Sequence, residues 1–437
     1  MAGKLFNLPQ IGILRQLSSD GRLLFITRIA RLFAYGSLSV VLALYLAQVG
    51  LSDQQIGLLL TLTLIGDTII SLLITTNADR IGRKRMLIFG AGLMVLAGIV
   101  FALTGNFILL IVAATVGVIS PSGKDVGPFL SIEQASLTQL MPDSMRTQIF
   151  AWYNLAGSFA TAVGALLGGA LSQILQGSGV SSLASYRVIV LIYAAIGILL
   201  AILFTRLSST VEVPDRSLFS KDGRGAHSRG FLGLHTSGGV VLRLAGLFSI
   251  DAFAGGFVVQ SLVAYWFNKR FGVDPALLGG IFFGANILAG FSALSAAWVA
   301  KRIGLLNTMV FTHLPSNVLL ILVPIMPTLP LAITMLLLRF SISQMDVPTR
   351  QSYTMAVVDP DERSSASGIT GIARTIGAAV APTFAGLLLA NPVLLSVPFF
   401  ISGGLKIVYD LIIYRSFRGI KPPEEQQDRS KEVLSHH

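Results

Sequence analysis

Residues 75–86 read Thr-Thr-Asn-Ala-Asp-Arg-Ile-Gly-Arg-Lys-Arg-Met, a short charged stretch between two long apolar runs. The runs cover about 51–75 and 86–104, and each has about the 20 residues that a helix needs to cross a membrane. Positive charge in a short turn between two such helices is typical of cytoplasmic loops. Gly82 suits the turn, and Asp79 is placed to hold the start of the next helix. The stretch predicts two membrane helices joined by a cytoplasmic loop.

The composition of the whole chain agrees with a membrane protein. Of 437 residues, 53% are apolar and only 12% are charged, whereas a soluble domain has about 25% charged residues. The net charge of +11 resides mostly in short loops, which indicates contact with the lipid bilayer and not with nucleic acid. There is no Cys, and four of the five His lie in loop or tail. We therefore expect no metal site and no cofactor.

The apolar segments predict an all-α membrane protein with twelve transmembrane helices. The fourth and tenth segments carry several polar residues each, and the run 120–128 interrupts the fourth with two Pro and two Gly. Broken backbone at membrane depth is tolerated where it lines a cavity or is buried in protein. The predicted spans are 23–48, 52–75, 86–104, 107–137, 147–175, 185–206, 240–268, 276–300, 308–326, 330–358, 364–390 and 393–415.

Loop charge sets the expected orientation. With both termini in the cytoplasm, twenty-two Lys and Arg fall on that side and three on the other. The polar region between the sixth and seventh spans reads as a flexible linker. The predicted parts are a cytoplasmic N-terminus (1–22), two six-helix halves (23–206 and 240–415), a cytoplasmic linker (207–239) and a cytoplasmic tail (416–437). We expect a monomer in the plasma membrane.

The two halves repeat each other in sequence. Ala78-Asp-Arg-Ile-Gly82 returns as Ala300-Lys-Arg-Ile-Gly304, with the acid lost. Farther along each half, the segment 164–169 corresponds to 381–386. Internal repeats are typical of secondary transporters, in which the substrate site lies near the middle of the bilayer between the repeats.

The charged loop resembles the signature loop of the major facilitator superfamily, which is built as two six-helix pseudo-repeat halves. Thr75 and Asn77 depart from the Gly and Leu that are usual in the family. The resemblance extends over nearly the whole chain and implies a cytoplasmic gate that latches one conformation. We assign to this gate the matching loop residues and two expected partners, namely Asp79, Arg80, Gly82, Arg83, Lys84, Glu133 and Arg146.

The fifth span resembles the antiporter motif of the same superfamily. Gly164, Gly168 and Gly169 match the motif, whereas Ala160 replaces its first Gly and Ala165 its Pro. Small residues at this spacing also permit close packing between helices. The segment therefore predicts tight helix packing and favours antiport.

Several ionisable residues fall near the middle of the predicted spans. Each costs on the order of 2.5–3.5 kcal/mol to insert, so each is a candidate functional residue. In the superfamily, helices 1, 4, 7 and 10 line the cavity. The resemblance thus places on the substrate pathway Arg28, Arg31, Tyr35, Lys124, Asp125, Asp251, Asp346 and Arg350. The acids that we expect to carry protons are Asp67, Asp125, Asp251 and Asp346; Lys406 and Asp410 are spaced as a local ion pair in the last span.

These features predict a secondary active transporter of a small molecule that works by alternating access. No nucleotide-binding motif and no catalytic constellation occurs, so we expect neither an ATP-driven pump nor an enzyme. Proton-coupled antiport, with efflux of small amphipathic compounds, is favoured by the fifth span. Uptake or exchange of an anionic metabolite is the alternative, favoured by Arg28, Arg31, Lys124 and Arg350. A transport-inactive sensor would need no buried acid–base pairs.

Overall fold

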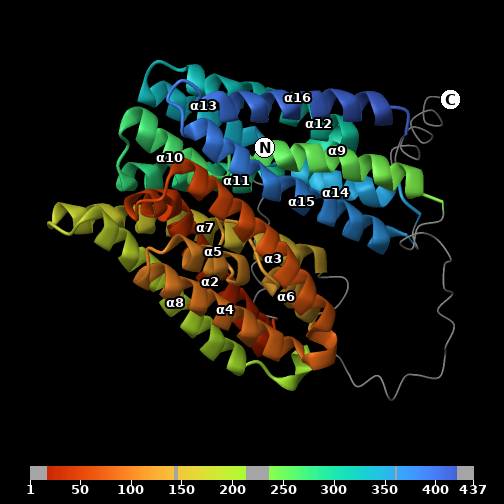
Figure 1. Ribbon diagram of the computed structural model, residues 1–437. Coiled ribbons are helices and arrows are strands. Elements are labelled where there is room, and N and C mark those ends of the chain that lie inside the picture. Colours follow the sequence, from red (N-terminus) through yellow and green to blue (C-terminus); the bar gives the residue numbers. More distant parts are fainter. Residues whose placement is uncertain (1–16, 142–145, 213–235, 360–361, 421–437) are drawn as a thin grey trace, which may run out of the picture. The chain divides into compact units, whose positions relative to one another are not determined.

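The computed structural model describes residues 17–141, 146–212, 236–359 and 362–420, and every extended regular element among them is a helix (Figure 1). The extreme N-terminus, most of the predicted linker and most of the tail lie outside these residues. The chain divides into two compact units. One comprises Met1–Gly223 with Gln260–Asn286, and the other comprises Arg224–Val259 with Ile287–His437.

The first unit holds most of the N-terminal helices. They are α2 (Ser19–Gln48), α3 (Asp53–Ile81), α4 (Arg83–Leu103), α5 (Phe107–Val116), α6 (Phe129–Gln139), α7 (Arg146–Gly177), α8 (Ser182–Thr205), the 3-10 turn η4 (Ser209–Val211) and α10 (Gln260–Phe271). Helix α11 (Pro275–Ile303) begins in this unit and continues into the other. The second unit holds α9 (Gly238–Gly256), α12 (Leu305–Leu322), the 3-10 turn η6 (Val323–Ile325), α13 (Leu329–Ile342), α14 (Asp346–Ala356), α15 (Arg363–Leu389) and α16 (Val397–Phe417).

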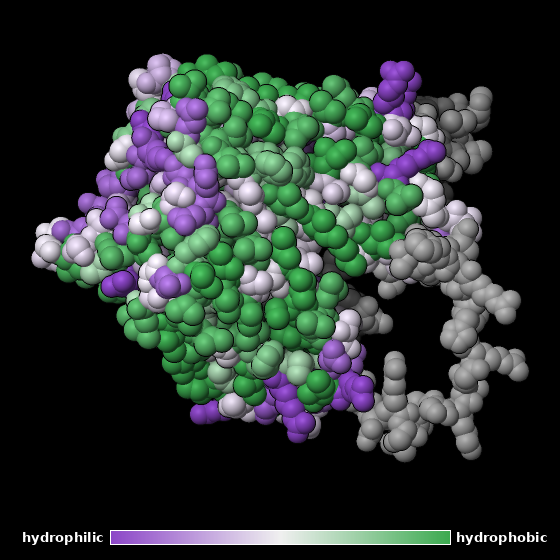
Figure 2. All heavy atoms as spheres, viewed as in Figure 1, coloured by the Kyte–Doolittle hydropathy of each residue, from purple (hydrophilic) through white to green (hydrophobic). Residues whose placement is uncertain are grey.

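The outer surfaces of the helices are apolar. Large hydrophobic side chains stand exposed along their length, among them Leu103, Ile174 and Leu242, which are 78%, 68% and 72% exposed. On the face shown in Figure 2, hydrophobic residues cover the sides of the helices and hydrophilic residues lie mostly near their ends. Exposed apolar surface on this scale would be unstable in water and matches the hydrocarbon of a bilayer.

Ten helical stretches in the described residues are long and apolar enough to cross a membrane. The fourth and tenth predicted spans are each divided into two shorter helices, α5 with α6 and α13 with α14 (Figure 1). The interruption expected at 120–128 is present, because α5 ends at Val116 and α6 begins at Phe129. The fold is therefore the expected all-α arrangement of twelve crossings.

The seventh and tenth spans are present, but each contains a break that the sequence analysis did not mark. The seventh span ends as α9 at Gly256 and resumes as α10 at Gln260, because consecutive glycines at 255–256 give the backbone freedom to leave the helix. The tenth span breaks between α13 and α14, before Pro348. Proline is tolerated in the first turn of a new helix, where its missing N–H costs nothing.

Helices α2 and α9 occupy equivalent places in the two halves. A Cβ added to Gly36 of α2 would collide with the backbone carbonyl of Thr161 on α7, and one on Gly256 of α9 with that of Ala378 on α15. Thr161 and Ala378 are themselves equivalent in the repeat of 164–169 and 381–386. Counting back five residues from each glycine gives Arg31 and Asp251. The same position of the fold thus holds opposite charges in the two halves.

Candidate functional site

A buried ion-pair cluster lies within the first unit, between α2, α6 and the break after α5. The Arg31 guanidinium binds both carboxylate oxygens of Glu133, at 2.6 and 2.7 Å, and Asp125 Oδ1 at 3.0 Å. The side chains of Arg31 and Glu133 have no exposed surface. This two-pronged geometry is the strongest that a carboxylate and an arginine form.

The second arginine of α2 completes this N-terminal cluster. Arg28 Nη1 lies 2.8 Å from Asp125 Oδ2, and Nη2 donates to Asn154 Oδ1 at 3.2 Å. Its guanidinium stacks 4.2 Å from the ring centre of Tyr153, whose hydroxyl donates to Glu133. Two arginines therefore face two carboxylates, and the formal charges cancel.

Glu133, expected as a partner of the cytoplasmic loop, does not bind residues 79–84. Glu133 binds Arg31, Tyr153 and Thr27 instead, because its position on α6 turns it into the protein and not towards the 79–84 loop. The distance of Glu133 from the cytoplasmic end of its helix, which is all that the sequence provides, does not tell which way the side chain points. The side chain of Arg146 lies outside the described residues.

Three other predicted residues surround the break in the fourth span. The Tyr35 hydroxyl donates to the Val126 carbonyl at 3.5 Å, and Lys124 is exposed. Asp67 has a buried Oδ1 without a hydrogen-bond partner, and no cation lies within 4.0 Å of it among the described residues. Of the four candidate proton-carrying acids, Asp67 alone lacks a described ion pair, whereas Asp125, Asp251 and Asp346 each have one.

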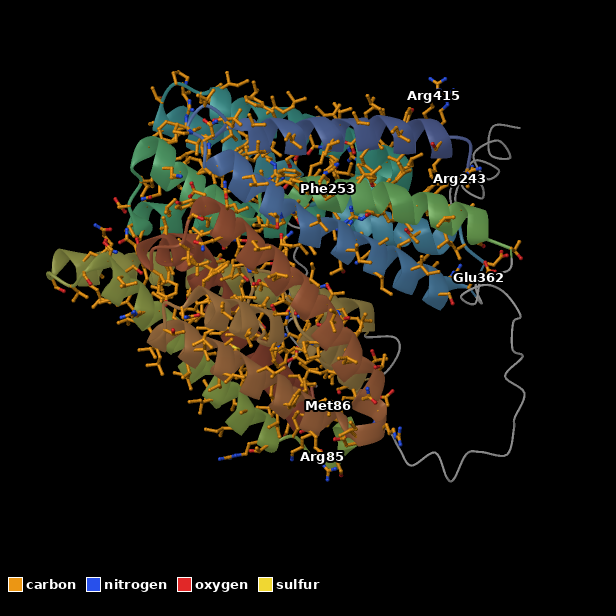
Figure 3. The ribbon with its side chains drawn as sticks, in the orientation of Figure 1. Arg85, Met86, Arg243, Phe253, Glu362 and Arg415 are labelled. Atoms are coloured by element: carbon orange, nitrogen blue, oxygen red, sulfur yellow. The ribbon has the colours of Figure 1, made fainter. Side chains whose placement is uncertain are left out.

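A second buried cluster lies within the second unit, centred on Asp251 of α9. Lys406 Nζ lies 2.5 Å from Asp251 Oδ1, and Nη1 of Arg350 lies 3.2 Å from Oδ2. Arg374 Nη1 adds a longer contact of 3.6 Å. Arg350 also binds Asp346 at 2.9 Å, one helical turn away on α14. In Figure 3, Phe253 lies near the C-terminal end of α9, two residues from Asp251, and Arg243 lies near its start.

The predicted local pair between Lys406 and Asp410 is wrong. Lys406 turns to Asp251, and Asp410 accepts from His313 Nδ1 at 2.8 Å and from Asn317 Nδ2 at 2.9 Å. A helical spacing of four residues makes a local pair possible, but a buried charge binds whichever partner the neighbouring helices supply. His313 and Asn317 received no role from the sequence. In the sequence, His313 is a lone histidine within an apolar span, and this pattern gave little indication of a functional residue.

The 79–84 loop is tied to the segment that follows α8. Asp79 binds Arg83 at 2.9 Å, and Arg83 also donates to Gln139 and to the carbonyl of Val211. The start of α4 is held by Glu212, which accepts from the backbone amides of Arg83 and Lys84 at 2.7 and 3.1 Å. The cap expected from Asp79 is thus supplied by Glu212. Gly82 has φ +113°, Arg80 is exposed, and Figure 3 marks the start of α4 with Arg85 and Met86.

The glycines of the fifth span lie against neighbouring backbone. A Cβ on Gly164 or Gly168 would collide with α2, at Phe33 or Ser37, and one on Gly169 with α11 at Pro275. These contacts account for the small residues by packing alone.

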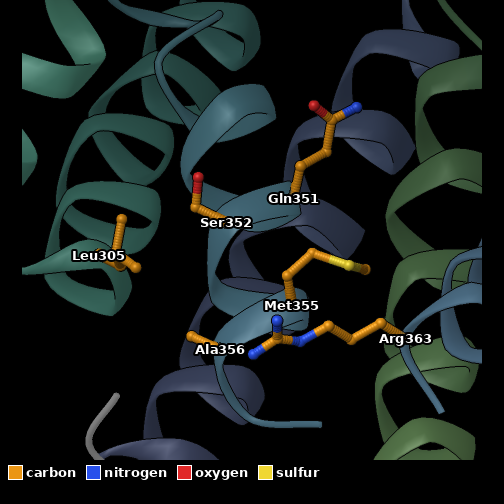
Figure 4. Close-up of a pocket in the computed structure, with 6 residues that line it drawn as sticks. All are labelled: Leu305, Gln351, Ser352, Met355, Ala356 and Arg363. Atoms are coloured by element: carbon orange, nitrogen blue, oxygen red, sulfur yellow. The ribbon is translucent and has the colours of Figure 1, made fainter. Parts of the chain in front are cut away.

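One cavity of about 400 Å³ opens in the second unit (Figure 4). It is lined by Leu305, Gln351, Ser352, Met355, Ala356 and Arg363. Figure 4 shows Arg363 and Met355 side by side across it. None of these residues belongs to the Asp251 cluster. Among the described residues, no group of three or more His, Asp or Glu could hold a metal ion.

Twelve crossings in two repeated halves, with buried charge in each, define the fold of a polytopic membrane transporter. The model of the Major Facilitator Superfamily matches residues 24–382. The chain belongs to this superfamily.

An uncharacterized membrane protein of Saccharomyces cerevisiae is 31% identical over 433 residues, covering 94% of this chain and 96% of that protein. Solved structures share the fold at lower identity. A bacterial homologue of the human lysosomal transporter Spinster, inward-facing and unoccupied, has a TM-score of 0.66 at 17% identity, covering 90% of this chain and 94% of its own. A D-xylose-proton symporter has a TM-score of 0.68 at 17% identity, with coverages of 90% and 97%. Family and fold together indicate an integral membrane transporter and not an enzyme.

Proposed function

We propose that the protein is a proton-coupled secondary transporter that exports small amphipathic molecules by antiport, and that Asp251 is its coupling acid. One observation carries the proposal. The buried carboxylate of Asp251 is contacted by Lys406, Arg350 and Arg374, each from a different helix. Protonation of this single group would weaken the contacts of α9 with α14, α15 and α16 at once.

The physical basis is the cost of unpaired charge in a low-dielectric interior. While Asp251 is ionised, it offsets the positive charge around it. When it is neutral, the cations must find other partners, because a buried charge without one is destabilising by several kcal/mol, about 3–5 in measured cases. Such a change can bias the packing of helices, which alternating access requires.

Antiport is supported by the sequence of α7, whose glycines match part of the antiporter motif while they pack against α2 and α11. The D-xylose-proton symporter among the structural neighbours supports proton coupling in this fold, not its direction. We further propose that both termini lie in the cytoplasm, as the distribution of loop charge indicates, and that the protein resides in the plasma membrane.

The alternative of an anionic substrate needs basic side chains that are available to a ligand. Arg31 is fully buried and already bonded to Glu133 and Asp125. Arg350 is bonded to Asp251 and Asp346. These arginines neutralise acids of the protein itself, which favours a cationic or neutral substrate.

The test uses purified protein in vesicles with an imposed pH gradient. Ethidium and other lipophilic cations serve as probes of the proposed function. Phosphate and succinate serve as probes of the alternative, an anionic substrate. We expect Asp251→Asn to abolish gradient-driven accumulation while counterflow of the same probe persists. Asp359→Asn, at an exposed acid in the same unit, is the matched control and should retain both. Full gradient-driven transport by Asp251→Asn would exclude Asp251 as the coupling acid.

A further inference from the structure

His313 of α12 is a buried titratable group in the same cluster. Its side chain is 5% exposed, and Nδ1 lies 2.8 Å from Asp410 Oδ1. The other nitrogen, Nε2, faces Asp251 Oδ1 at 3.8 Å, which is too long for a hydrogen bond. One imidazole thus lies between two carboxylates, bonded to one and separated from the other by a small gap.

The hydrogen bond to Asp410 sets the state of the ring. Nδ1 lies 2.8 Å from Asp410 Oδ1 and 3.2 Å from Asn317 Nδ2. An ionised carboxylate can only accept, so the shorter contact requires Nδ1 to carry the hydrogen. Asn317 holds the second oxygen of Asp410 at 2.9 Å and keeps that carboxylate in place. In the neutral ring, Nε2 then points a lone pair at Asp251. A proton on Nε2 turns this repulsive contact into an attractive one.

The charges that face His313 come from every neighbouring helix of the second unit. Three acids and four bases make up the cluster, so it carries one formal positive charge while the ring is neutral. A proton entering at His313 adds a second. These groups are Asp251 of α9, Arg339 of α13, Asp346 and Arg350 of α14, Arg374 of α15, and Lys406 and Asp410 of α16, with the phenol of Tyr409 also beside the ring.

We propose that His313 is the residue that receives the proton and delivers it to Asp251. The proton binds Nε2, and the imidazolium competes with Lys406 for Asp251 Oδ1. Transfer of this proton to Oδ1 then leaves a neutral Asp251 and a neutral ring whose Nδ1–H still donates to Asp410. No other group changes its proton count. The inference deepens the proposed function and rests on it, because it supplies the path to the coupling acid.

The test needs no known substrate. The imidazole nitrogens of ¹⁵N-histidine-labelled full-length protein in detergent micelles report charge and tautomer by nuclear magnetic resonance. Comparison with His313→Gln assigns the signals of His313, since the chain has only five histidines. We expect the Nδ1–H tautomer while the ring is neutral and a second proton on Nε2 when the pH is lowered.

Two variants test whether the proton is shared with Asp251. Asp251→Asn removes the acceptor, and Lys406→Met removes the competitor; both should move the titration midpoint of His313, in opposite directions. Asp359→Asn is again the control and should leave it unchanged. A ring that stays neutral at every pH at which the protein remains folded, or a midpoint that neither variant moves, would overturn the proposal.

Transport measurements separate this inference from the proposed function. With His313→Gln, gradient-driven transport should lose its dependence on pH while counterflow remains. If wild-type transport ignores the pH gradient yet the His313 titration responds to Asp251→Asn, the proposed function fails and the His313–Asp251 linkage stands. If Asp251→Asn uncouples transport but His313→Gln keeps the wild-type pH profile, the proton reaches Asp251 by another path and the inference fails.

Discussion

The two buried charge clusters occupy equivalent places in the two halves but differ in chemistry. Arg31 on α2 and Asp251 on α9 lie at the same position of the repeat, five residues before glycines that pack alike. Around Arg31 the partners are carboxylates, and around Asp251 they are bases. Repetition has preserved the backbone packing while the sign of the central charge has reversed.

The difference in chemistry indicates that the two clusters have different roles. The bases of the N-terminal cluster are arginines, which stay charged at any physiological pH, and both oxygens of Glu133 are bonded. The C-terminal cluster contains a lysine and a histidine, whose charge can change within a protein. We infer that the first cluster is a structural anchor and the second a switch.

Removal of the central arginine should have the largest effect and would test the anchor. Arg31→Met leaves Glu133 buried without its cation, so we expect a loss of about 3–5 kcal/mol in the free energy of unfolding. Thermal unfolding in detergent, followed by tryptophan fluorescence, measures the loss. The double variant Arg31→Met/Glu133→Gln removes both charges and should recover most of it. A single variant as stable as wild type would contradict the anchor.

The equivalent glycines test whether packing is conserved while charge is not. Gly36→Val and Gly256→Val each force a side chain against a backbone carbonyl of the facing helix, and we expect losses of about 1–3 kcal/mol. The two losses should be similar, because each added side chain meets the equivalent carbonyl of the facing helix. Gly246→Ala, where a Cβ meets open space, is the control and should be tolerated. Unequal losses in this assay would mean that the halves differ in packing as well.

The smallest effect is expected outside both clusters, at the 79–84 loop. Glu212→Gln weakens the hold on the first amides of α4, and loss of a cap costs about 0.5–2 kcal/mol. Asp79→Asn removes only a largely exposed partner of Arg83 and should cost less. The melting temperatures of the two variants show which substitution destabilises the protein more. If Asp79→Asn proved the more destabilising, Asp79 and not Glu212 would hold this loop.

Much of the architecture followed from the sequence because it depends on local quantities. The length and hydropathy of each segment predict the crossings, and the order of residues 79–84 indicates the superfamily. The break in the fourth span was readable from Pro121, Gly123, Gly127 and Pro128. Breaks in the seventh and tenth spans were missed, because paired glycines and one proline are compatible with a continuous membrane helix.

The sequence by itself thus determined that this chain crosses the membrane in two repeated halves and buries charge in each. Only the tertiary structure decided which charges meet. Glu133 joins Arg31 from 102 positions away, and Lys406 joins Asp251 from 155. Asp410 binds His313 of α12 and not Lys406, which lies four residues away on its own helix. In a low-dielectric interior a charge binds the partner with the best geometry, and that geometry is set by how the helices pack.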